Sequence, residues 1–251
     1  MKLLFLGTGA ADRMCAPLND HFLDKDARRC ASALVDGHVL IDCGPHVMNA
    51  LSVAGIAPFA ISDIVVTHLH GDHYCEETLA ALAKSAGHPL RLWFREGGKP
   101  KEIPGIIPCP MTLFTAYSVG GLTVTGVPGN HTASPQHLIF EKDGKKFFYA
   151  LDGAWILYDT VKFIDKMAFD AVIFDATVGD YEGDLRVGEH NSIPMIRLML
   201  PSLKTVGAIT DDTKLILSHM AVILHKSHEE TERLLASEGL LPAWDGWEIE
   251  V

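Results

Sequence analysis

The chain has 251 residues, of which 48% are hydrophobic, so it is long enough to bury a sizeable core. Its formal net charge of -11 argues against a large basic surface of the kind that binds nucleic acid. No segment approaches the roughly 20 consecutive apolar residues that cross a membrane. We therefore expect one domain over residues 1–251, with no large nucleic acid and no membrane as a partner.

The start of the chain and its cysteines bear on the compartment. The apolar run in MKLLFLGTGA meets Gly7 and Gly9 before it reaches the length of a signal-peptide core. The cysteines form an odd, scattered set without CxxC spacing, which indicates reduced thiols. They are Cys15, Cys30, Cys43, Cys75 and Cys109. We expect a cytoplasmic protein.

The first half of the chain alternates apolar strands with amphipathic helices. A strand over 2–9 runs into a glycine turn, and residues 32–44 predict a hairpin around Asp36 and Gly37. A helix over 46–55 follows Pro45, a strand over 63–68 comes next, and the acids that open CEETLAALAKSAG predict a helix over 75–87. The segment from Glu96 to Pro110 is rich in proline and glycine, so we expect a long loop that joins the halves.

The second half repeats the alternation, which places the whole chain in the α/β class. Strands are predicted over 122–128, 137–152, 171–177, 215–219 and 247–251, with a turn at Asp143 and Gly144 inside the second. Helices are predicted over 155–168, 191–200 and 227–239, the last opened by Ser227 with Glu230 at the capping-box spacing.

Three histidines and an aspartate follow the strand that ends in VVT. His68 and His70 are two residues apart, so on an extended segment their side chains share one face. Gly71 then allows a turn that brings Asp72 and His73 towards the same point. This spacing predicts two pairs of metal ligands, and a solvated polar turn is the alternative.

Three later residues have the character of further ligands. His131, Asp152 and His219 each lie at the end of an apolar strand or just after it. Because open α/β sheets place ligand-binding groups at the carboxyl ends of strands, we expect them to converge with the first cluster. Each residue alone has another interpretation: a single histidine at a strand end is usually a hydrogen-bonded surface or core residue, and Asp152 with Gly153 is compatible with a simple turn.

The expected chemistry follows from the ligand types. Imidazoles with a few carboxylates suit zinc, manganese or iron. Two such ions about 3.5 to 4 Å apart share a water and lower its pKa towards neutrality, which makes hydroxide available as a nucleophile. A serine or cysteine nucleophile is then unnecessary, and GTGAAD lacks the third glycine of a dinucleotide-binding motif.

The motif THLHGDH, together with FLGTGA at 5–10 and IDCG at 41–44, resembles the metallo-β-lactamase superfamily over nearly the full length of the chain. The resemblance implies an αββα sandwich that binds two divalent ions, with Asp42 orienting a ligand imidazole. The ligand set that it implies is His68, His70 and His131 for one ion, Asp72, His73 and His219 for the other, and Asp152 as a bridge.

Looser similarities point within the superfamily to the cyclic phosphodiesterase of the bacterial phosphonate (carbon–phosphorus lyase) pathway. They are VPGNH at 127–131, EHN at 189–191 and WDGWEI at 244–249. The similarity implies that His190 contacts the phosphate or protonates the leaving oxygen, a task suited to the pKa of histidine. We expect Asp72 to take part in catalysis as well as in metal binding. The alternative is that His190 is a surface residue capping the next helix.

The expected function is therefore metal-dependent hydrolysis of a small, possibly cyclic, phosphodiester, and a homodimer is compatible with it. Other activities of the superfamily are a tRNA 3'-processing nuclease, a lactone or thioester hydrolase, and an iron-dependent oxygenase. A non-catalytic carrier role in cofactor biosynthesis is a third class, which the full ligand set disfavours. Fold-level similarity does not decide among them.

The phosphodiesterase binds an additional structural zinc through three cysteines and a histidine, and this chain differs from it in those residues. Here the corresponding loop offers only Cys15, His21 and Cys30, and Val222 replaces the histidine. We expect two metals and no structural zinc. Of the remaining histidines, four are expected to face solvent, namely His38, His88, His225 and His228, whereas His46 and His137 are candidates for the cleft wall.

Overall fold

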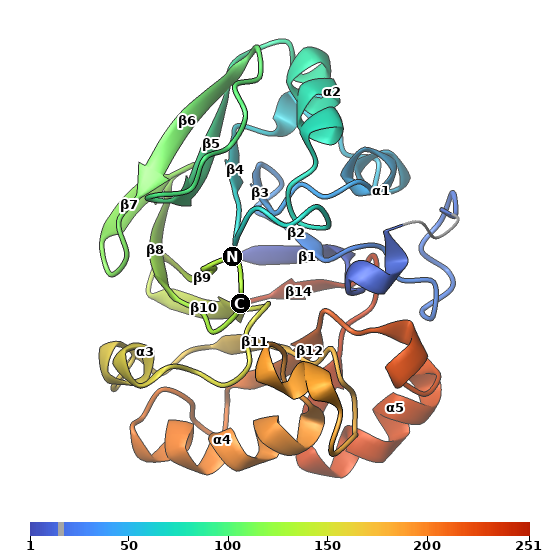
Figure 1. The fold of residues 1–251 in the computed structure, drawn as a ribbon, viewed down its shortest axis with the longest axis vertical. Helices are drawn as coiled ribbons and strands as arrows, with labels where there is room; N and C mark the ends of the chain where they lie inside the picture. Colours follow the sequence, from blue (N-terminus) through green and yellow to red (C-terminus); the bar gives the residue numbers. More distant parts are fainter. Residues whose placement is uncertain (15–17) are drawn as a thin grey trace.

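The computed structural model describes residues 1–14 and 18–251. Two facing β-sheets form the centre of the molecule, and helices cover the outer face of each sheet (Figure 1). The first half of the chain builds one sheet and the second half builds the other, except that the last strand returns to the first sheet. This arrangement is the expected αββα sandwich.

The first sheet has seven strands in the order β14-β1-β2-β3-β4-β5-β6. Their bounds are β1 Lys2–Gly7, β2 Ser32–Val35, β3 Val39–Ile41, β4 Asp63–Val65, β5 Leu90–Arg95, β6 Ile106–Met111 and β14 Glu248–Glu250. Pairing is antiparallel from β14 to β3 and parallel from β3 to β6. The carboxyl ends of β3 and β4 therefore lie side by side.

The second sheet has seven strands in the order β13-β12-β11-β10-β9-β8-β7. Their bounds are β7 Ala116–Val119, β8 Leu122–Pro128, β9 Gln136–Lys142, β10 Lys145–Ala150, β11 Ala171–Asp175, β12 Lys214–Ser218 and β13 Leu240–Pro242. Pairing is antiparallel from β7 to β10 and parallel from β10 to β13. The carboxyl ends of β10, β11 and β12 therefore meet at one edge.

Two helices cover the first sheet and three cover the second (Figure 1). The former are α1 Val47–Val53 and α2 Glu76–Ala86, and the latter are α3 Tyr158–Phe163, α4 Ile193–Thr205 and α5 His228–Leu235. Short 3-10 turns are η1 Ala11–Arg13, η2 Pro58–Ala60, η3 Leu185–Gly188, η4 Val222–Leu224 and η5 Ala236–Glu238. Among the described residues no helix has the length and apolarity to cross a membrane.

The period-two alternation of apolar side chains explains the layers. In β1, Leu3 and Phe5 point into the core between the sheets, whereas Leu6 packs with α1 and α2. Phe140 and Phe147 stack in the central core with ring centroids 4.7 Å apart. Both faces of each sheet are thus buried, as in sheets covered by helices.

The two predicted hairpins are present, and their turns require backbone that Asp-Gly pairs adopt readily. Asp36 and Gly37 have φ of 48° and 77°, and Asp143 and Gly144 have φ of 52° and 78°. Positive φ at both central residues gives a turn whose twist matches that of the flanking strands.

Two predictions about elements are wrong. The segment from Glu96 to Pro110 is not wholly a loop, because Ile106–Met111 forms β6 at the edge of the first sheet. Prolines two residues apart are accommodated there, since an edge strand leaves every second N–H unpaired. The helix predicted over 155–168 covers only Tyr158–Phe163, and Lys166 and Ala168 beyond it have φ of 61° and 49°.

A buried polar network fastens the C-terminal segment to the loops beside β1. Thr8 Oγ1 donates to Asp245 Oδ1 at 2.9 Å, and Arg28 Nη1 donates to Thr8 Oγ1 at 2.7 Å. Arg29 Nη1 lies 3.3 Å from Asp245 Oδ2. Charges buried in this way are tolerated only when paired, so the network holds Arg28 and Arg29 against the sandwich.

Candidate metal centre

The histidine cluster lies on the loop after β4. The strand ends at Val65, earlier than predicted, so His68 and His70 belong to the loop and not to an extended strand. The carbonyl of His70 accepts from the backbone N–H of His73 at 3.0 Å, and this turn brings His73 back towards the sheet. Gly44 permits the close approach, because a Cβ there would lie 1.8 Å from the carbonyl oxygen of Asp72.

One group of three imidazoles converges at this loop. His68 Nε2 lies 2.9 Å from His70 Nδ1, and His131 Nε2 lies 3.2 Å from the same atom. His131 reaches the group from the loop after β8 in the other sheet. The structure thus brings together the residues predicted for the first ion.

A second group lies beside it and is more deeply buried. His73 Nε2 is 3.2 Å from both Asp72 Oδ2 and His219 Nε2. His219 comes directly after β12, so this group also combines ligands from both sheets. Each group has its nitrogen or oxygen atoms within 4.8 Å of one another, a separation that allows one ion to contact all three.

Asp152 stands between the two groups. Its Oδ2 lies 2.7 Å from His73 Nε2 and 3.2 Å from His219 Nε2, whereas its Oδ1 lies 4.0 Å from His131 Nε2. One carboxylate oxygen therefore faces each group. This is the arrangement that a bridging carboxylate requires.

The imidazole of His73 tests whether these residues fit a metal. Asp42 Oδ2 lies 2.7 Å from His73 Nδ1, so the Nδ1–H donates to Asp42 and the Nε2 lone pair points at carboxylate oxygens. Such a contact is stable only with a positive charge between the atoms. Burial opposes that charge, yet the nearby carboxylates hold the pKa of His73 well above its usual value. The residues fit a divalent cation.

Two similar aspartate–threonine pairs, one after a strand of each sheet, orient the imidazoles of the site. Thr67 Oγ1 donates to Asp42 Oδ1 at 3.0 Å and lies 3.0 Å from His68 Nδ1. In the other sheet Thr177 Oγ1 lies 2.8 Å from both Asp175 Oδ1 and His219 Nδ1. In each pair the hydroxyl donates to the carboxylate and accepts from Nδ1–H. The Nε2 of each histidine is then free to bind a metal.

Backbone strain is concentrated at this site. Asp42, Asp152 and His219 have φ of 60°, 54° and 56°, in the left-handed region that residues other than glycine rarely adopt. Asp42 and His219 directly follow a strand, Asp152 comes two residues after the end of β10, and the strained backbone turns each side chain into the site. Strain of this kind persists where surrounding structure enforces a functional geometry.

Removal of the Asp42 carboxylate should weaken metal binding without unfolding the chain. Asp42→Asn keeps the size of the side chain and tolerates φ of 60°, but its amide no longer favours donation from His73 Nδ1–H. We expect metal affinity to fall about 10- to 100-fold in competition with a chelator. Asp36→Asn, in a turn outside the site, is the control, and equal affinities for both variants would contradict this role.

Asp175 is a site residue that the sequence prediction missed. Its Oδ2 lies 2.8 Å from His190 Nδ1, and it closes a group with Asp152, His190 and His219. Burial alone would lower the pKa of His190, but the Asp175 carboxylate outweighs burial and raises it to about 9. The signal was available, because AVIFDAT ends a strand with an aspartate just as IDCG does.

The metal site opens into a cavity of about 290 Å³. Besides the candidate ligands, its wall includes Asp12, Thr177, Arg186 and His190. The ring of His190 stacks on His219, with centroids 5.4 Å apart. Ser192, and not His190, caps α4, so the alternative interpretation of His190 as the helix cap is wrong.

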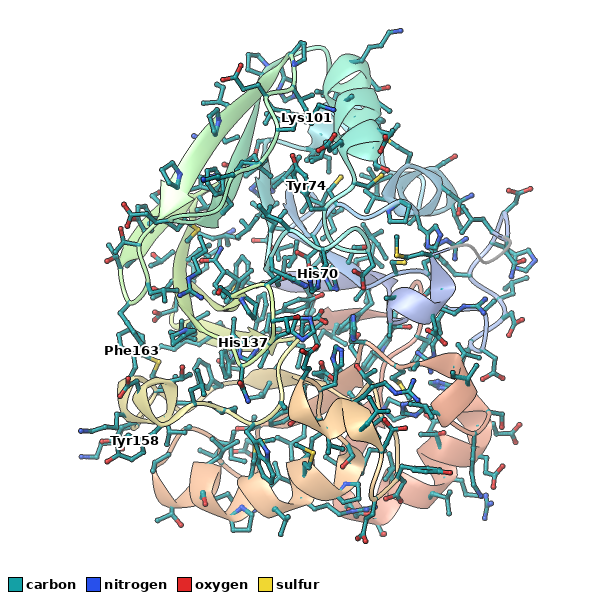
Figure 2. All side chains as sticks on the ribbon, in the orientation of Figure 1. His70, Tyr74, Lys101, His137, Tyr158 and Phe163 are labelled. Carbon is teal, nitrogen blue, oxygen red and sulfur yellow. The ribbon has the colours of Figure 1, made fainter. Side chains whose placement is uncertain are left out.

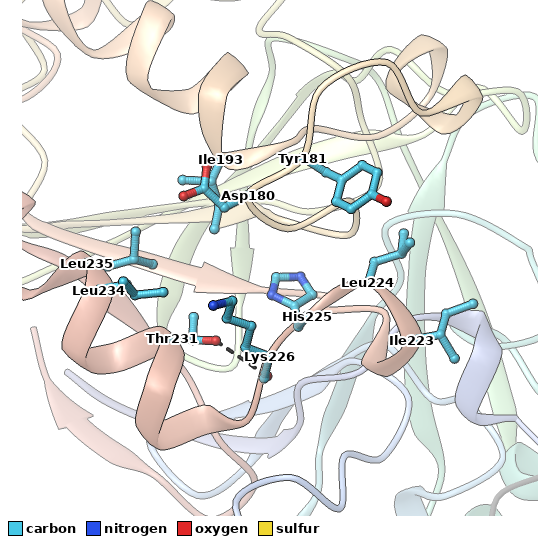
Figure 3. Close-up of a pocket in the computed structure, with 10 residues that line it drawn as sticks. All are labelled: Asp180, Tyr181, Ile193, Ile223, Leu224, His225, Lys226, Thr231, Leu234 and Leu235. Atoms are coloured by element: carbon cyan, nitrogen blue, oxygen red, sulfur yellow. Dashed lines mark hydrogen bonds between the residues drawn. The ribbon is translucent and has the colours of Figure 1, made fainter.

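The predictions for His225 and His228 are wrong. His228 is only 2% exposed, and its ring packs edge-on to Trp244 at 5.2 Å. His225 is mostly covered and lies in the wall of a second cavity of about 490 Å³ (Figure 3). Its Nε2 lies 2.6 Å from the carbonyl oxygen of Ala176. Burial lowers the pKa of both histidines to about 4, so both are neutral at pH 7.

The remaining histidines divide into buried and exposed positions. His88 is exposed as predicted, whereas His38 is half-buried and has its Nε2 2.7 Å from the carbonyl oxygen of Gly120. His46 accepts from the backbone N–H of Cys30, and neither His46 nor His137 lines the metal cavity. His137, labelled in Figure 2, is fully buried beside Gly153, where a Cβ would meet its Nε2 at 2.6 Å.

The prediction that the chain has no structural zinc concerns Cys15, His21 and Cys30, and Cys15 lies outside the described residues. Of the other two candidates, His21 is exposed and Cys30 is buried. Burial raises the pKa of the Cys30 thiol to about 12, which disfavours the thiolate that zinc requires. The four cysteines in the part of the chain that the structure describes are free.

Comparison with known proteins adds a partial family match and two distant relatives. The model of the family "Anti-Pycsar protein Apyc1" matches residues 1–96. A Thermus thermophilus protein named as a metal-dependent hydrolase is 26% identical over 68% of this chain and 76% of its own length. A ribonuclease Z from Pyrobaculum arsenaticum is 29% identical over 94% of this chain and 80% of its own length.

Several solved structures match the whole chain, and two of them are described below. The metallo-β-lactamase fold protein YhfI from Bacillus subtilis has a TM-score of 0.74 at 15% identity, covering 100% of this chain and 99% of that one. A diphosphatase from the PhnP family has a TM-score of 0.70 at 20% identity, covering 100% and 97%. At such identities the likeness concerns the fold alone, and the closer similarity to a phosphonate-pathway phosphodiesterase stays a prediction. The chain has the metallo-β-lactamase fold.

Proposed function

We propose that the chain is a metal-dependent hydrolase that binds two divalent ions and cleaves small phosphodiesters. The observation that carries the proposal is Asp152, which lines the cavity and whose two oxygens face two separate ligand groups. Names of relatives support it, since one is called a metal-dependent hydrolase and one structural neighbour a diphosphatase.

The ligands are those brought together in the structure. His68, His70 and His131 would hold one ion, Asp72, His73 and His219 the other, and Asp152 both. When bound, two such ions supply a hydroxide nucleophile at neutral pH and neutralise charge on the non-bridging phosphate oxygens. The nitrogen and oxygen donors suit zinc or manganese, and iron as well.

One residue, His190, is the proposed proton donor for the leaving group. His190 Nδ1–H donates to the Asp175 carboxylate, which leaves Nε2–H as the group available to the cavity. With its pKa raised to about 9, the ring is protonated at pH 7. In the proposed step the bond from phosphorus to the leaving oxygen breaks, and that oxygen takes the proton from Nε2.

The cavity and the charge of the chain favour a small substrate. A volume of about 290 Å³ accommodates a molecule of roughly nucleotide size. The net charge of -11 opposes the binding of a long polyanion. A small phosphodiester, cyclic or linear, fits both observations.

Ribonuclease Z activity is the second candidate. The relative from Pyrobaculum arsenaticum covers 94% of this chain, and the chemistry of RNA cleavage would use the same two ions. The acidic charge weighs against it, because RNA affinity depends on basic residues that contact phosphates.

An activity screen of metal-reconstituted protein tests both proposals. The substrates are cyclic nucleotides, cyclic ribose phosphates, bis(4-nitrophenyl) phosphate, a tRNA precursor, lactones and thioesters. We expect cleavage of the small phosphodiesters and two metal ions per chain by elemental analysis. Turnover of lactones or thioesters alone would contradict the proposal, and turnover of the precursor alone would favour the second candidate.

A further inference from the structure

Arg186 is the one lysine or arginine side chain in the wall of the metal cavity, among the residues that the structure describes. It lies in η3, and its backbone carbonyl accepts from the backbone N–H of His190 at 2.9 Å. The guanidinium is therefore carried on the same turn as the proposed proton donor. Neither the ligand set nor the proposed chemistry uses it.

A fork to Asp184 fixes the guanidinium. Arg186 Nε donates to Asp184 Oδ1 at 2.9 Å, and Nη2 donates to Asp184 Oδ2 at 3.0 Å. Asp184 Oδ1 also accepts from the backbone N–H of Arg186, which holds the turn itself. The fork engages two of the three guanidinium nitrogens, so no hydrogen bond within the described chain engages Nη1. The side chain remains 38% exposed.

The charges of the cavity wall show why this group matters for an anionic substrate. Asp12, Asp72 and Asp152 all line the cavity. Asp72 and Asp152 face the proposed metal ions, but Asp12 belongs to neither ligand group. A phosphate that enters beside these carboxylates gains from a fixed cation at the wall. Arginine suits that task, because its planar donors match phosphate oxygens and its charge persists at any working pH.

We propose that Arg186 is a specificity-determining residue that binds a phosphate oxygen of the substrate through Nη1 and selects anionic phosphate esters over neutral esters. The proposal rests on the proposed phosphodiesterase function. The fork to Asp184 uses Nε and Nη2, so Nη1 is the guanidinium nitrogen assigned to this contact. Neutral lactones, thioesters and carboxylic esters offer no charge for this contact.

Arg186→Gln tests the proposal on two substrates that share a leaving group. Bis(4-nitrophenyl) phosphate is anionic and 4-nitrophenyl acetate is neutral. We expect kcat/KM to fall about 10- to 100-fold for the phosphate, the size of one hydrogen bond to a charged group, and less than about 3-fold for the acetate. Equal losses on both substrates, or no loss on the phosphate, would overturn the proposal.

Asp184→Asn separates recognition from loop structure. This variant weakens the fork but keeps the cation, so its preference for the phosphate should stay within about 3-fold of that of the unaltered protein. Arg186→Lys retains charge without the planar donors and should lose less than Arg186→Gln. If Asp184→Asn reproduces the selective loss of Arg186→Gln, the effect lies in the turn and the proposal fails.

Calorimetric titration with inorganic phosphate gives a readout that needs no turnover. For the metal-loaded protein we expect Kd to be about 10- to 100-fold weaker in Arg186→Gln, and unchanged Kd would overturn the proposal. Failure of the phosphodiesterase proposal looks different. There the unaltered protein would cleave the acetate and not the phosphodiester, while phosphate affinity would still report on Arg186.

Discussion

Asp152→Asn should lower turnover by more than about 10³-fold and remove most of the bound metal. One oxygen of Asp152 faces each ligand group, so the change withdraws a negative ligand from both ions at once. Ions in such sites supply several kcal/mol of transition-state stabilisation, which corresponds to roughly three or more orders of magnitude in rate. Asparagine is the suitable replacement because it adopts the φ of 54° found here.

Asp143→Asn is the matched control for this variant. Asp143 also precedes a glycine and has a positive φ of 52°, but it lies in the turn between β9 and β10. Metal content by elemental analysis, turnover, and the change in Tm on addition of a chelator are measured for both variants. A ligand that binds only the folded state raises Tm, so chelation should lower the Tm of the control and barely affect Asp152→Asn. Near-normal metal content in Asp152→Asn would refute the bridging role.

His190→Ala should reduce turnover about 10²- to 10⁴-fold for phosphodiesters with poor leaving groups, and far less for a 4-nitrophenyl ester. The difference arises because an alkoxide needs a proton to leave, whereas nitrophenolate leaves unaided. Comparison of kcat for an alkyl and a nitrophenyl phosphodiester measures it. Equal losses on both substrates would show that His190 binds or positions the phosphate instead.

The pH dependence gives a second measurement of the same role. The Asp175 carboxylate raises the pKa of His190 to about 9, so the proton donor is present below that pH and is lost above it. Turnover of the poor leaving group should therefore decline as the pH rises through this region. Asp175→Asn removes the charge that raises the pKa, and the decline should move to lower pH. An unmoved decline would assign it to another group.

The local sequence was sufficient to predict most helices and strands and the part of the candidate site that lies on one loop. Asp36-Gly37 and Asp143-Gly144 predict their hairpins because positive φ is a property of those residues themselves. The spacing of His68, His70, Asp72 and His73 predicts their proximity, since chain geometry limits how far neighbours separate. The convergence of His131, Asp152 and His219 was predictable because each follows an apolar strand, and strand ends meet at one edge.

Tertiary structure decided the features that depend on residues distant in the chain. Burial of His225 and His228 depends on what packs over them, and β6 forms because β5 offers it an edge. The pairing of Asp175 with His190, and the position of Arg186 beside the metal cavity, arise from how loops settle against β11 and α4. The position of Asp175 at a strand end was readable in the sequence, but its partner was not, and an arginine gives no periodic signal, because such roles are set by the charge and geometry of partners that only folding brings near.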